Sequence, residues 1–333
     1  MKKITITIFI ALAVISAQSK VGTSAAQFLG IGVGPKSIAM GSAFTSIADD
    51  ASTLYWNPGA ISRLSESQTM FSNTNWLVNT NIHLLAGVLK INQSNAIGIF
   101  ITQLDYGEEE ITDLYNQSGT GLYWKASDLV TGISYARNLT NRFSIGGSFK
   151  YISQKIYNES ASSVGLDVGL LYQSLNDKFR IGMSISNFGP DMQLDGKDLL
   201  KTIDLDPDNS GHNETIVAKL KTDAWPLPLF FRVGISTDVI STDVVDLTLA
   251  SDFFMPSDDV ESVNFGLQAG FLDRVFLRAG YKAIGDSASE EGLTFGLGAK
   301  IHISGLGFVV DYAAQDFGKF GYIQHWGMSI LLK

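Results

Sequence analysis

The stretch SIAMGSAFTSIADDASTLYWNP, from Ser37 to Pro58, differs from the rest of this 333-residue chain. Apolar and small residues recur in it at three- to four-residue spacing, with Ile38 and Phe44 among them. This period predicts a helix that ends at Asp49-Asp50. Proline and glycine then stop regular structure directly after the stretch. Every later segment of the chain has the pattern of a strand.

After residue 63 the apolar pattern changes to strict alternation. In the runs 142–151, 178–186 and 293–303, large apolar residues occupy one face while small and charged residues occupy the other. Alternation over about ten residues, between turn residues, is typical of a transmembrane β-strand. A soluble β-sandwich alternates as well, but its dry core would have to hold the inward charges, which are Asp167, Arg180, Arg232, Asp246, Arg278, Lys282 and Asp311. A polar barrel lumen accommodates such charges, so we predict an outer-membrane barrel.

Fourteen strands can be counted, an even number, as bacterial barrels require. They are expected at 68–79, 81–91, 93–104, 127–138, 142–156, 160–174, 178–188, 228–240, 243–255, 260–272, 274–284, 291–304, 306–316 and 321–333. Short turns then fall on one side of the barrel, and the opposite side receives two long external loops, 105–126 and 189–227. The predicted fold is therefore all-β, a fourteen-stranded antiparallel transmembrane barrel.

The barrel is expected to contain an N-terminal plug. About eight strands is the width that inward side chains can just fill, so fourteen leave an open lumen. The segment before the first strand is the material available to close it. The expected organisation is a signal peptide over 1–19, a helical or irregular hatch over 20–66 and the barrel over 67–333.

Composition and the first residues agree with an exported membrane barrel. Charged residues are 17% of the chain, below the roughly 25% of ordinary soluble domains. Lys2-Lys3, a short apolar run and Ala17-Gln18-Ser19 form an export signal, although an uncleaved anchor is the alternative. No other apolar stretch reaches the about 18 residues of a spanning helix.

Charge and cysteine content exclude other classes. The chain has no cysteine, which excludes disulfides, a thiol nucleophile and a lipid-carrying cysteine. Its formal charge of −9 becomes −11 without the two lysines of the signal. Phosphate binding demands a basic surface, so we expect no nucleic-acid partner.

The run GPKSIAMGSAFTSIADDASTLYWNPGAI, from Gly34 to Ile61, resembles the N-terminal signature of the PorV/PorQ family of outer-membrane proteins. That family is similar to the long-chain fatty-acid transporter FadL, which implies a fourteen-stranded barrel with an N-terminal hatch. Two departures are Asn57-Pro58-Gly59, where the superfamily commonly has Asn-Pro-Ala, and a C-terminus that ends in lysine rather than in an aromatic residue.

The resemblance implies one of two functions. The first is a non-enzymatic docking or shuttle component of type IX secretion, with a secretion translocon or an exported cargo protein as partner. The second is a FadL-like channel for fatty acids or other hydrophobic small molecules. Either would lie in the outer membrane of a Gram-negative-type, Bacteroidota-like bacterium, in contact with its lipid and with the N-terminus periplasmic. Small and charged inward faces favour the first, since a channel needs a continuous apolar pocket.

Candidate site residues fall in the hatch and in the second long loop. We expect the hatch to be held by Asp49, Asp50, Tyr55, Trp56, Asn57 and Pro58. The two aspartates would pair with Arg142, Arg180 or Arg278, or else form a solvated acidic turn. The two aromatic residues would face a ligand path or pack against the wall. Ligand or partner contacts are expected at Phe44, Trp225, Pro226, Leu227, Pro228 and Leu229, unless the last five belong to the aromatic girdle beside Phe230 and Phe231.

No catalytic residue, cofactor or metal site is predicted. Asp204, Asp206 and Asp208 alternate like calcium ligands, but the following glycine comes two places late for an EF-hand. His212 has no partner histidine at ligand spacing, and the remaining histidines, His83, His302 and His325, are scattered over three strands. The chain lacks G-x-S-x-G and any phosphate or dinucleotide fingerprint, while a triad formed only in space stays open.

Overall fold

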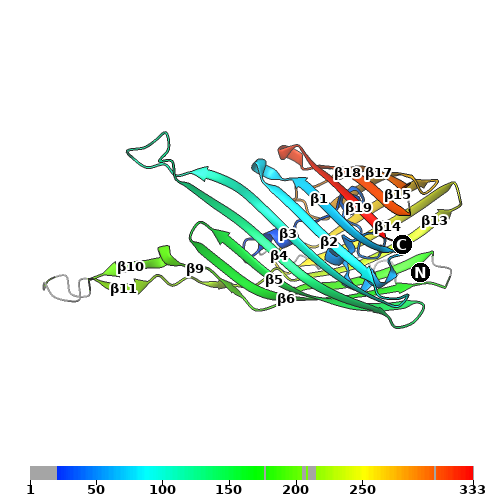
Figure 1. Cartoon of the computed structure of the whole chain (residues 1–333), viewed down its shortest axis with the longest axis horizontal. Helices are drawn as coiled ribbons and strands as arrows, with labels where there is room; N and C mark the ends of the chain where they lie inside the picture. Colours follow the sequence, from blue (N-terminus) through cyan, green and yellow to red (C-terminus); the bar gives the residue numbers. More distant parts are fainter. Residues whose placement is uncertain (1–20, 176–177, 205–207, 209–214, 304, 333) are drawn as a thin grey trace, which may run out of the picture.

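The computed structural model describes residues 21–175, 178–204, 208, 215–303 and 305–332. Within them, fourteen long antiparallel strands form a closed barrel (Figure 1). The strands are β1 (Ser67–Asn75), β2 (Asn81–Lys90), β3 (Asn95–Glu110), β4 (Tyr123–Asn138), β5 (Phe143–Ile156), β6 (Glu159–Gln173), β7 (Phe179–Phe188), β13 (Phe230–Ser241), β14 (Val245–Pro256), β15 (Ser262–Phe271), β16 (Val275–Ile284), β17 (Leu293–Ile303), β18 (Leu306–Asp316) and β19 (Tyr322–Leu332). The pairing of β1 with β19, which places Ser67 opposite Leu332, closes the ring. The predicted fourteen-stranded barrel is confirmed.

The wall of the barrel has an apolar outer face and a mixed inner face. On β3, Ile97, Ile99 and Ile101 point outward and are exposed, whereas the alternating residues Phe100 and Thr102 are buried. The same alternation fixes the pairing register of each strand, because a shift by one residue would turn every apolar side chain inward. Outside β1, β3 and β4, the observed bounds lie within two residues of the expected ones.

The first long loop is shorter than expected. Past a bulge between Asp105 and Glu108, β3 and β4 continue to pair up to Glu110 opposite Tyr123. Polar side chains interrupt the apolar alternation of β3 after Asp105. Outside lipid, however, two strands can pair through their backbones without an alternating apolar pattern. The second long loop contains the short strands β8 (Met192–Gln193), β9 (Asp195–Gly196), β10 (Leu200–Ile203), β11 (Ile216–Lys219) and β12 (Ala224–Trp225).

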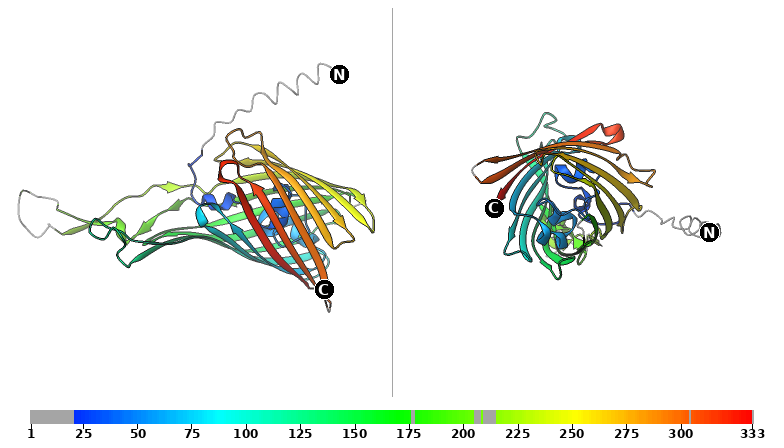
Figure 2. Two further views of the ribbon diagram at one scale, coloured as in Figure 1. Left: turned by 90° about the horizontal axis from the view of Figure 1, so that it is seen from above. Right: turned by 90° about the vertical axis from the view of Figure 1, so that its right-hand side faces the viewer.

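The segment before β1 lies inside the barrel (Figure 2). It contains η1 (Gln27–Gly30), α2 (Pro35–Ala39), α3 (Thr53–Trp56) and η2 (Pro58–Arg63), and further 3₁₀ turns occur at η3 (Leu77–Asn79), η4 (Lys197–Leu199) and η5 (Gly318–Phe320). The prediction of a helix that continues to Asp49-Asp50 is therefore wrong beyond Ala39, where α2 ends. Gly41 and Ser42 have φ of 63° and 64°, in the left-handed region that ends a helix.

The hatch runs the length of the lumen. Near its start, Gln27 donates to Asp258 in the loop after β14, at 2.8 Å, on the side of the long loops. Near its end, Arg63 donates to the carbonyls of Thr140 and Asn141, at 2.8 and 2.9 Å, in a short turn at the opposite side. The first described residues thus lie at the long-loop mouth. No helix among the described residues is long and apolar enough to span a bilayer.

Candidate functional site

Glycines on the inner wall allow the hatch backbone to lie against the barrel. A Cβ added to Gly280 of β16 would lie 2.2 Å from the amide nitrogen of Gly41. A Cβ added to Gly182 of β7 would lie 2.1 Å from the carbonyl oxygen of Thr45. Real Cβ atoms do not approach other atoms so closely, and therefore these wall glycines are required by the hatch. The small inward residues that suggested a polar lumen are a packing surface.

Asn57 connects the two halves of the hatch to the wall. Its buried amide donates to the carbonyl oxygens of Thr45 and Leu170, at 2.8 and 2.9 Å, and its Oδ1 accepts from the amide of Gly59 at 3.1 Å. Pro58 follows as the first residue of η2 and is buried as well. The side-chain amide of Asn57 thus fastens the Asn-Pro-Gly turn to the wall.

Asp252 of β14 is a wall residue that the sequence did not single out. Its Oδ2 accepts from the backbone amides of Phe44 and Thr45, at 2.9 and 2.8 Å. In the sequence, Asp252 is one acidic residue among others on the strands. Nothing near it in the sequence indicates a partner 207 residues earlier. Charge-assisted hydrogen bonds to backbone amides are stronger than neutral ones, so Asp252 holds the middle of the hatch.

Asp49 and Asp50 do not pair with the arginines proposed for them. Asp49 pairs with Lys36, inside the hatch. The wall arginines have their own partners, since Arg180 lies 2.7 Å from Asp238 and Arg278 lies 2.5 Å from Asp311. Arg142 is exposed.

Asp50 is buried, and its Oδ1 accepts from the amide and hydroxyl of Ser52, at 2.8 and 2.5 Å. Burial first, and then the charge of Asp49, raise the pKa of Asp50 to about 6, against the opposing effects of Lys36 and Ser52. The acidic pair thus forms contacts within the hatch, with Asp50 buried and Asp49 exposed beside Lys36.

An arginine surrounded by aromatic rings lies above the hatch. The guanidinium carbon of Arg232 lies 4.7 to 5.5 Å from four ring centroids, which belong to Tyr55, Trp56, Phe230 and Phe254. Arg232 is 4% exposed, and cation–π attraction strengthens in such dry surroundings. Burial raises the pKa of Tyr55, although Arg232 opposes the shift.

Tyr55 and Trp56 also bind the hatch to itself. The Tyr55 hydroxyl donates to the carbonyl oxygen of Leu29 at 2.9 Å, and the indole of Trp56 donates to that of Val33 at 3.1 Å. The ring of Phe44 lies 6.4 Å from that of Trp56. The contacts show both aromatic residues packed in the hatch, and Trp56 also borders the larger cavity described below.

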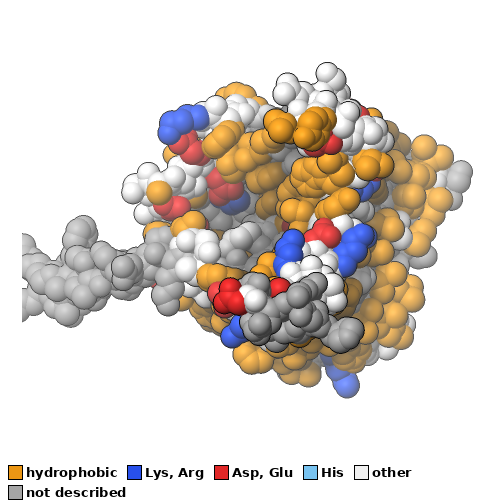
Figure 3. Space-filling view, turned by 90° about the vertical axis from the view of Figure 1, so that its left-hand side faces the viewer, with side chains coloured by type: hydrophobic (Ala, Val, Ile, Leu, Met, Phe, Trp, Pro, Cys, Tyr) orange, Lys and Arg blue, Asp and Glu red, His pale blue; other side chains and the backbone are white. Residues whose placement is uncertain are grey.

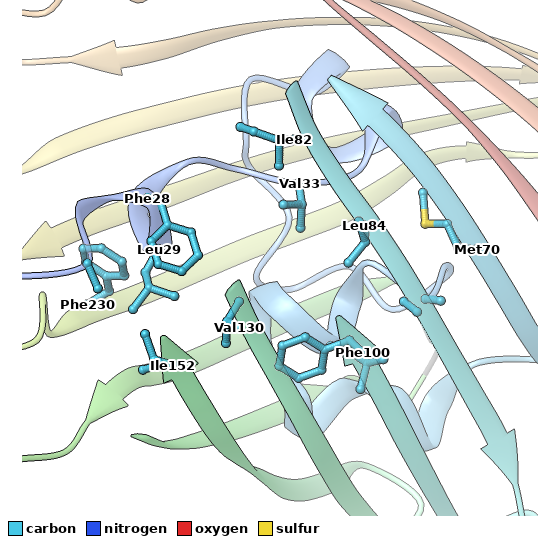
Figure 4. Packing of buried hydrophobic residues seen from close by; sticks show 14 of the residues in the cluster. Phe28, Leu29, Val33, Met70, Ile82, Leu84, Phe100, Val130, Ile152 and Phe230 are labelled. Atoms are coloured by element: carbon cyan, nitrogen blue, oxygen red, sulfur yellow. The ribbon is translucent and has the colours of Figure 1, made fainter. Parts of the chain in front are cut away.

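The apolar space between hatch and wall is filled by the chain itself. Phe28 and Leu29 of η1 project among Val130, Ile152 and Phe230 (Figure 4). The cavity that they leave measures about 20 Å³, room for about one water molecule.

A larger cavity of about 580 Å³ opens at the long-loop mouth and reaches Trp56 and Arg232. We call it the vestibule. Figure 3 views this end of the barrel, where acidic and hydrophobic side chains border a hollow.

The segment from Trp225 to Leu229 covers the start of the hatch. Ala25 donates to the carbonyl oxygen of Pro226 at 2.9 Å, and Asn187 donates to that of Pro228 at 2.8 Å. Leu227 is buried in the same cluster as Phe28. Trp225 and Leu229 remain exposed, by 46% and 37%, so only part of this segment is free for a partner.

The remaining candidates lie outside any assembled site. Asp206 and His212 of the acidic loop fall outside the described residues. Among the residues that are described, no three His, Cys, Asp or Glu side chains come together as metal ligands. His325 lies in the wall, with Nδ1 2.8 Å from the hydroxyl of Thr74.

Comparison with known proteins gives one family and one fold. The family model of the type IX secretion system protein PorV matches residues 15–204. No protein with a curated description matches the chain.

Solved structures of similar fold include the toluene transporter TbuX of Ralstonia pickettii, with 14% identity, a TM-score of 0.54 and coverage of 90% of this chain and 97% of that one. The monoaromatic hydrocarbon channel CymD has 14% identity and a TM-score of 0.54, with 90% and 96% covered. The toluene transporter TodX of Pseudomonas putida has 12% identity and a TM-score of 0.53, with the same coverage as CymD. At such identities the likeness concerns the fold.

Proposed function

Because the chain belongs to the family of the type IX secretion system protein PorV, we propose that it is a non-enzymatic docking component of type IX secretion. In this role its long loops face outward, and the second of them binds the translocon or an exported protein. The barrel supports these loops and does not conduct a solute.

The observation that carries the proposal is the closed interior. A channel for hydrophobic molecules needs a continuous apolar route from the mouth to the hatch. Here Phe28 and Leu29 occupy that space and leave about 20 Å³. Below them, wall glycines such as Gly182 and Gly280 contact the hatch backbone directly. A docking component needs no open route.

The hairpin of β10 and β11 is the surface that we propose for docking. It projects away from the barrel (Figure 1), and its apolar side chains are exposed, with Leu200 at 47% and Val217 at 63%. Exposed apolar groups on a soluble projection mark interaction sites. Trp225 and Leu229, at the base of the same loop, extend this surface.

The test is a pull-down of the tagged full chain from its own outer membrane. We expect secretion components to be recovered, and the double variant Leu200→Ser, Val217→Ser to reduce their recovery by about tenfold, as loss of an interface contact does. The control is Leu114→Ser, Tyr115→Ser, which alters apolar residues of the β3–β4 loop that are exposed even more, by 79% and 92%. Recovery of lipid alone would refute the proposal.

A channel for hydrophobic molecules is the second candidate. One observation favours it. Phe230 and Arg232 line both the vestibule and the small cavity of about 20 Å³ beside Phe28 and Leu29. Movement of η1 would join the two spaces. Uptake of a labelled fatty acid or toluene into proteoliposomes containing the full chain would support this candidate, and under docking alone we expect none.

A further inference from the structure

The vestibule combines an excess of carboxylates with an aromatic wall. Five acidic residues line it, namely Asp258, Asp259, Asp286, Glu290 and Glu291, against two basic ones, Lys282 and Arg232. The aromatic lining is formed by Trp76, Phe317, Phe320, Phe230, Phe254 and Trp56. A cavity lined by both kinds of group fits a ligand that has both positive charge and apolar surface.

Two of the five carboxylates are neutralised by lysines. Glu291 lies 2.6 Å from the ammonium of Lys282, and Glu290 lies 2.5 Å from that of Lys319. Arg232 sits against four aromatic rings at the base of the vestibule. Glu290 and Glu291 are thus already satisfied, and the uncompensated charge lies elsewhere.

The uncompensated charge is carried by Asp258, Asp259 and Asp286, in the loops after β14 and β16. Asp258 is 6% exposed and accepts from the neutral groups of Ser24 and Gln27. Burial raises the pKa of Asp259, and the charges of Asp286 and Asp258 raise it further, while the amide of Val260 opposes the shift. These three carboxylates repel one another, and a bound cation would relieve the repulsion.

An independent feature of the vestibule is an unpaired hydroxyl. Ser42 is 2% exposed, lines the vestibule, and its Oγ has no hydrogen-bond partner among the described residues. A buried polar group without a partner costs free energy. The ammonium group of a ligand can donate a hydrogen bond to this oxygen.

The apolar side of the vestibule contains three aromatic rings that pack against one another. The rings of Trp76 and Phe317 lie 5.3 Å apart, edge to face, and those of Phe317 and Phe320 lie 6.1 Å apart. They come from the two neighbouring loops after β1 and β18. Aromatic faces attract cations as well as apolar groups.

We propose that the vestibule binds a small organic cation, in which one ammonium group is attached to an aromatic or aliphatic body. The ammonium group lies near Asp259 and Asp286, and the body lies against Trp76 and Phe317. This site goes beyond docking, because it is formed by loops and hatch residues away from the β10–β11 hairpin.

Equilibrium dialysis of the full chain in detergent tests the site, with empty micelles subtracted. The probes are 2-phenylethylamine, the neutral 2-phenylethanol and the anion 3-phenylpropionate. We expect saturable binding of the amine, at least about tenfold tighter than that of the alcohol, and weakened by salt as an exposed charge pair is. Equal binding of amine and alcohol, or preference for the anion, would overturn the proposal.

Variants locate the binding. Asp259→Asn, Asp286→Asn should weaken amine binding about tenfold, whereas Glu108→Gln, in an exposed pair with Lys125 outside the vestibule, should leave it unchanged. Ser42→Gly suits the left-handed backbone and removes the hydroxyl, and should weaken binding a few-fold, roughly one neutral hydrogen bond. Unchanged affinity in the double variant would refute the site even if the amine binds.

Discussion

Asp50 is the buried acid whose ionisation should be visible in the stability of the hatch. Its Oδ2 has no hydrogen-bond partner among the described residues, and its pKa is raised to about 6. The folded protein therefore holds the proton more tightly than the unfolded chain does. The resulting stability is fully present below about pH 4 and is lost as the pH rises through about 6.

We predict that Asp50→Asn makes the hatch more stable at pH 7.5, by up to about 3 kcal/mol, and has little effect at pH 4. The asparagine Oδ1 can still accept from Ser52. The measurement is the unfolding midpoint in detergent, followed by tryptophan fluorescence at both pH values. Asp243→Asn is the control, because Asp243 is exposed in the short turn between β13 and β14. A gain that is equal at both pH values would contradict this account.

Residue roles could be predicted from the sequence only where they are local. Asn57 and Pro58 lie in a turn that their own identities determine, whereas the partner of Asp49 depends on how α2 is oriented. Lys36 is thirteen residues away, and no period connects the two. Asp252 and Arg232 act on hatch residues far away in sequence, so their roles became visible only with the hatch in place.

At the scale of elements, the contact between β16 and the hatch backbone restricts substitution. A Cβ at Gly280 would lie 2.2 Å from a backbone nitrogen of Gly41, which cannot move as a side chain can. We predict that Gly280→Ala loosens the hatch by about 1–3 kcal/mol, the usual cost of overpacking. Trypsin should then cleave faster after Lys36 and Arg63 in the folded barrel.

The matched control for this prediction is Gly87→Ala on β2. The nearest atoms to a Cβ at Gly87 are 3.8 Å away, in side chains of Ile99 and Thr69, which is ordinary contact. Alanine there should leave tryptic cleavage of the hatch unchanged. Equal protection of both variants would mean that the hatch does not rest on β16.

Strands were predictable from the sequence and the hatch helix was not, for one physical reason. One face of a strand contacts lipid and the other faces the lumen, so apolar residues alternate with small or polar ones along the strand. The residues around Phe44 are small because they lie against wall glycines such as Gly182, so their spacing does not report a helical face. A positive φ at Gly41 and Ser42 then turns the chain away from helical geometry.

At the scale of the whole molecule, the seal of the barrel is divided between two parts of the hatch. Phe28 and Leu29 fill the half near the long loops. The part from Met40 to Gly59 packs against the inner wall of β6, β7, β14 and β16, where it is held by Asp252, Asn57 and the wall glycines. Fourteen strands cannot close their own lumen, so each part contributes separately to closure.

We predict that the full chain in a planar bilayer shows no conductance steps and that a barrel lacking residues 21–63 does. The variant Phe28→Ala, Leu29→Ala should stay closed, because the part of the hatch from Met40 to Gly59 is unchanged. A difference in migration between unheated and heated samples on a denaturing gel verifies that each barrel is folded. A folded barrel without the hatch that stays closed would mean that the wall seals itself. Conductance in the alanine variant would instead place the seal at η1, which would favour a gated channel over a docking component.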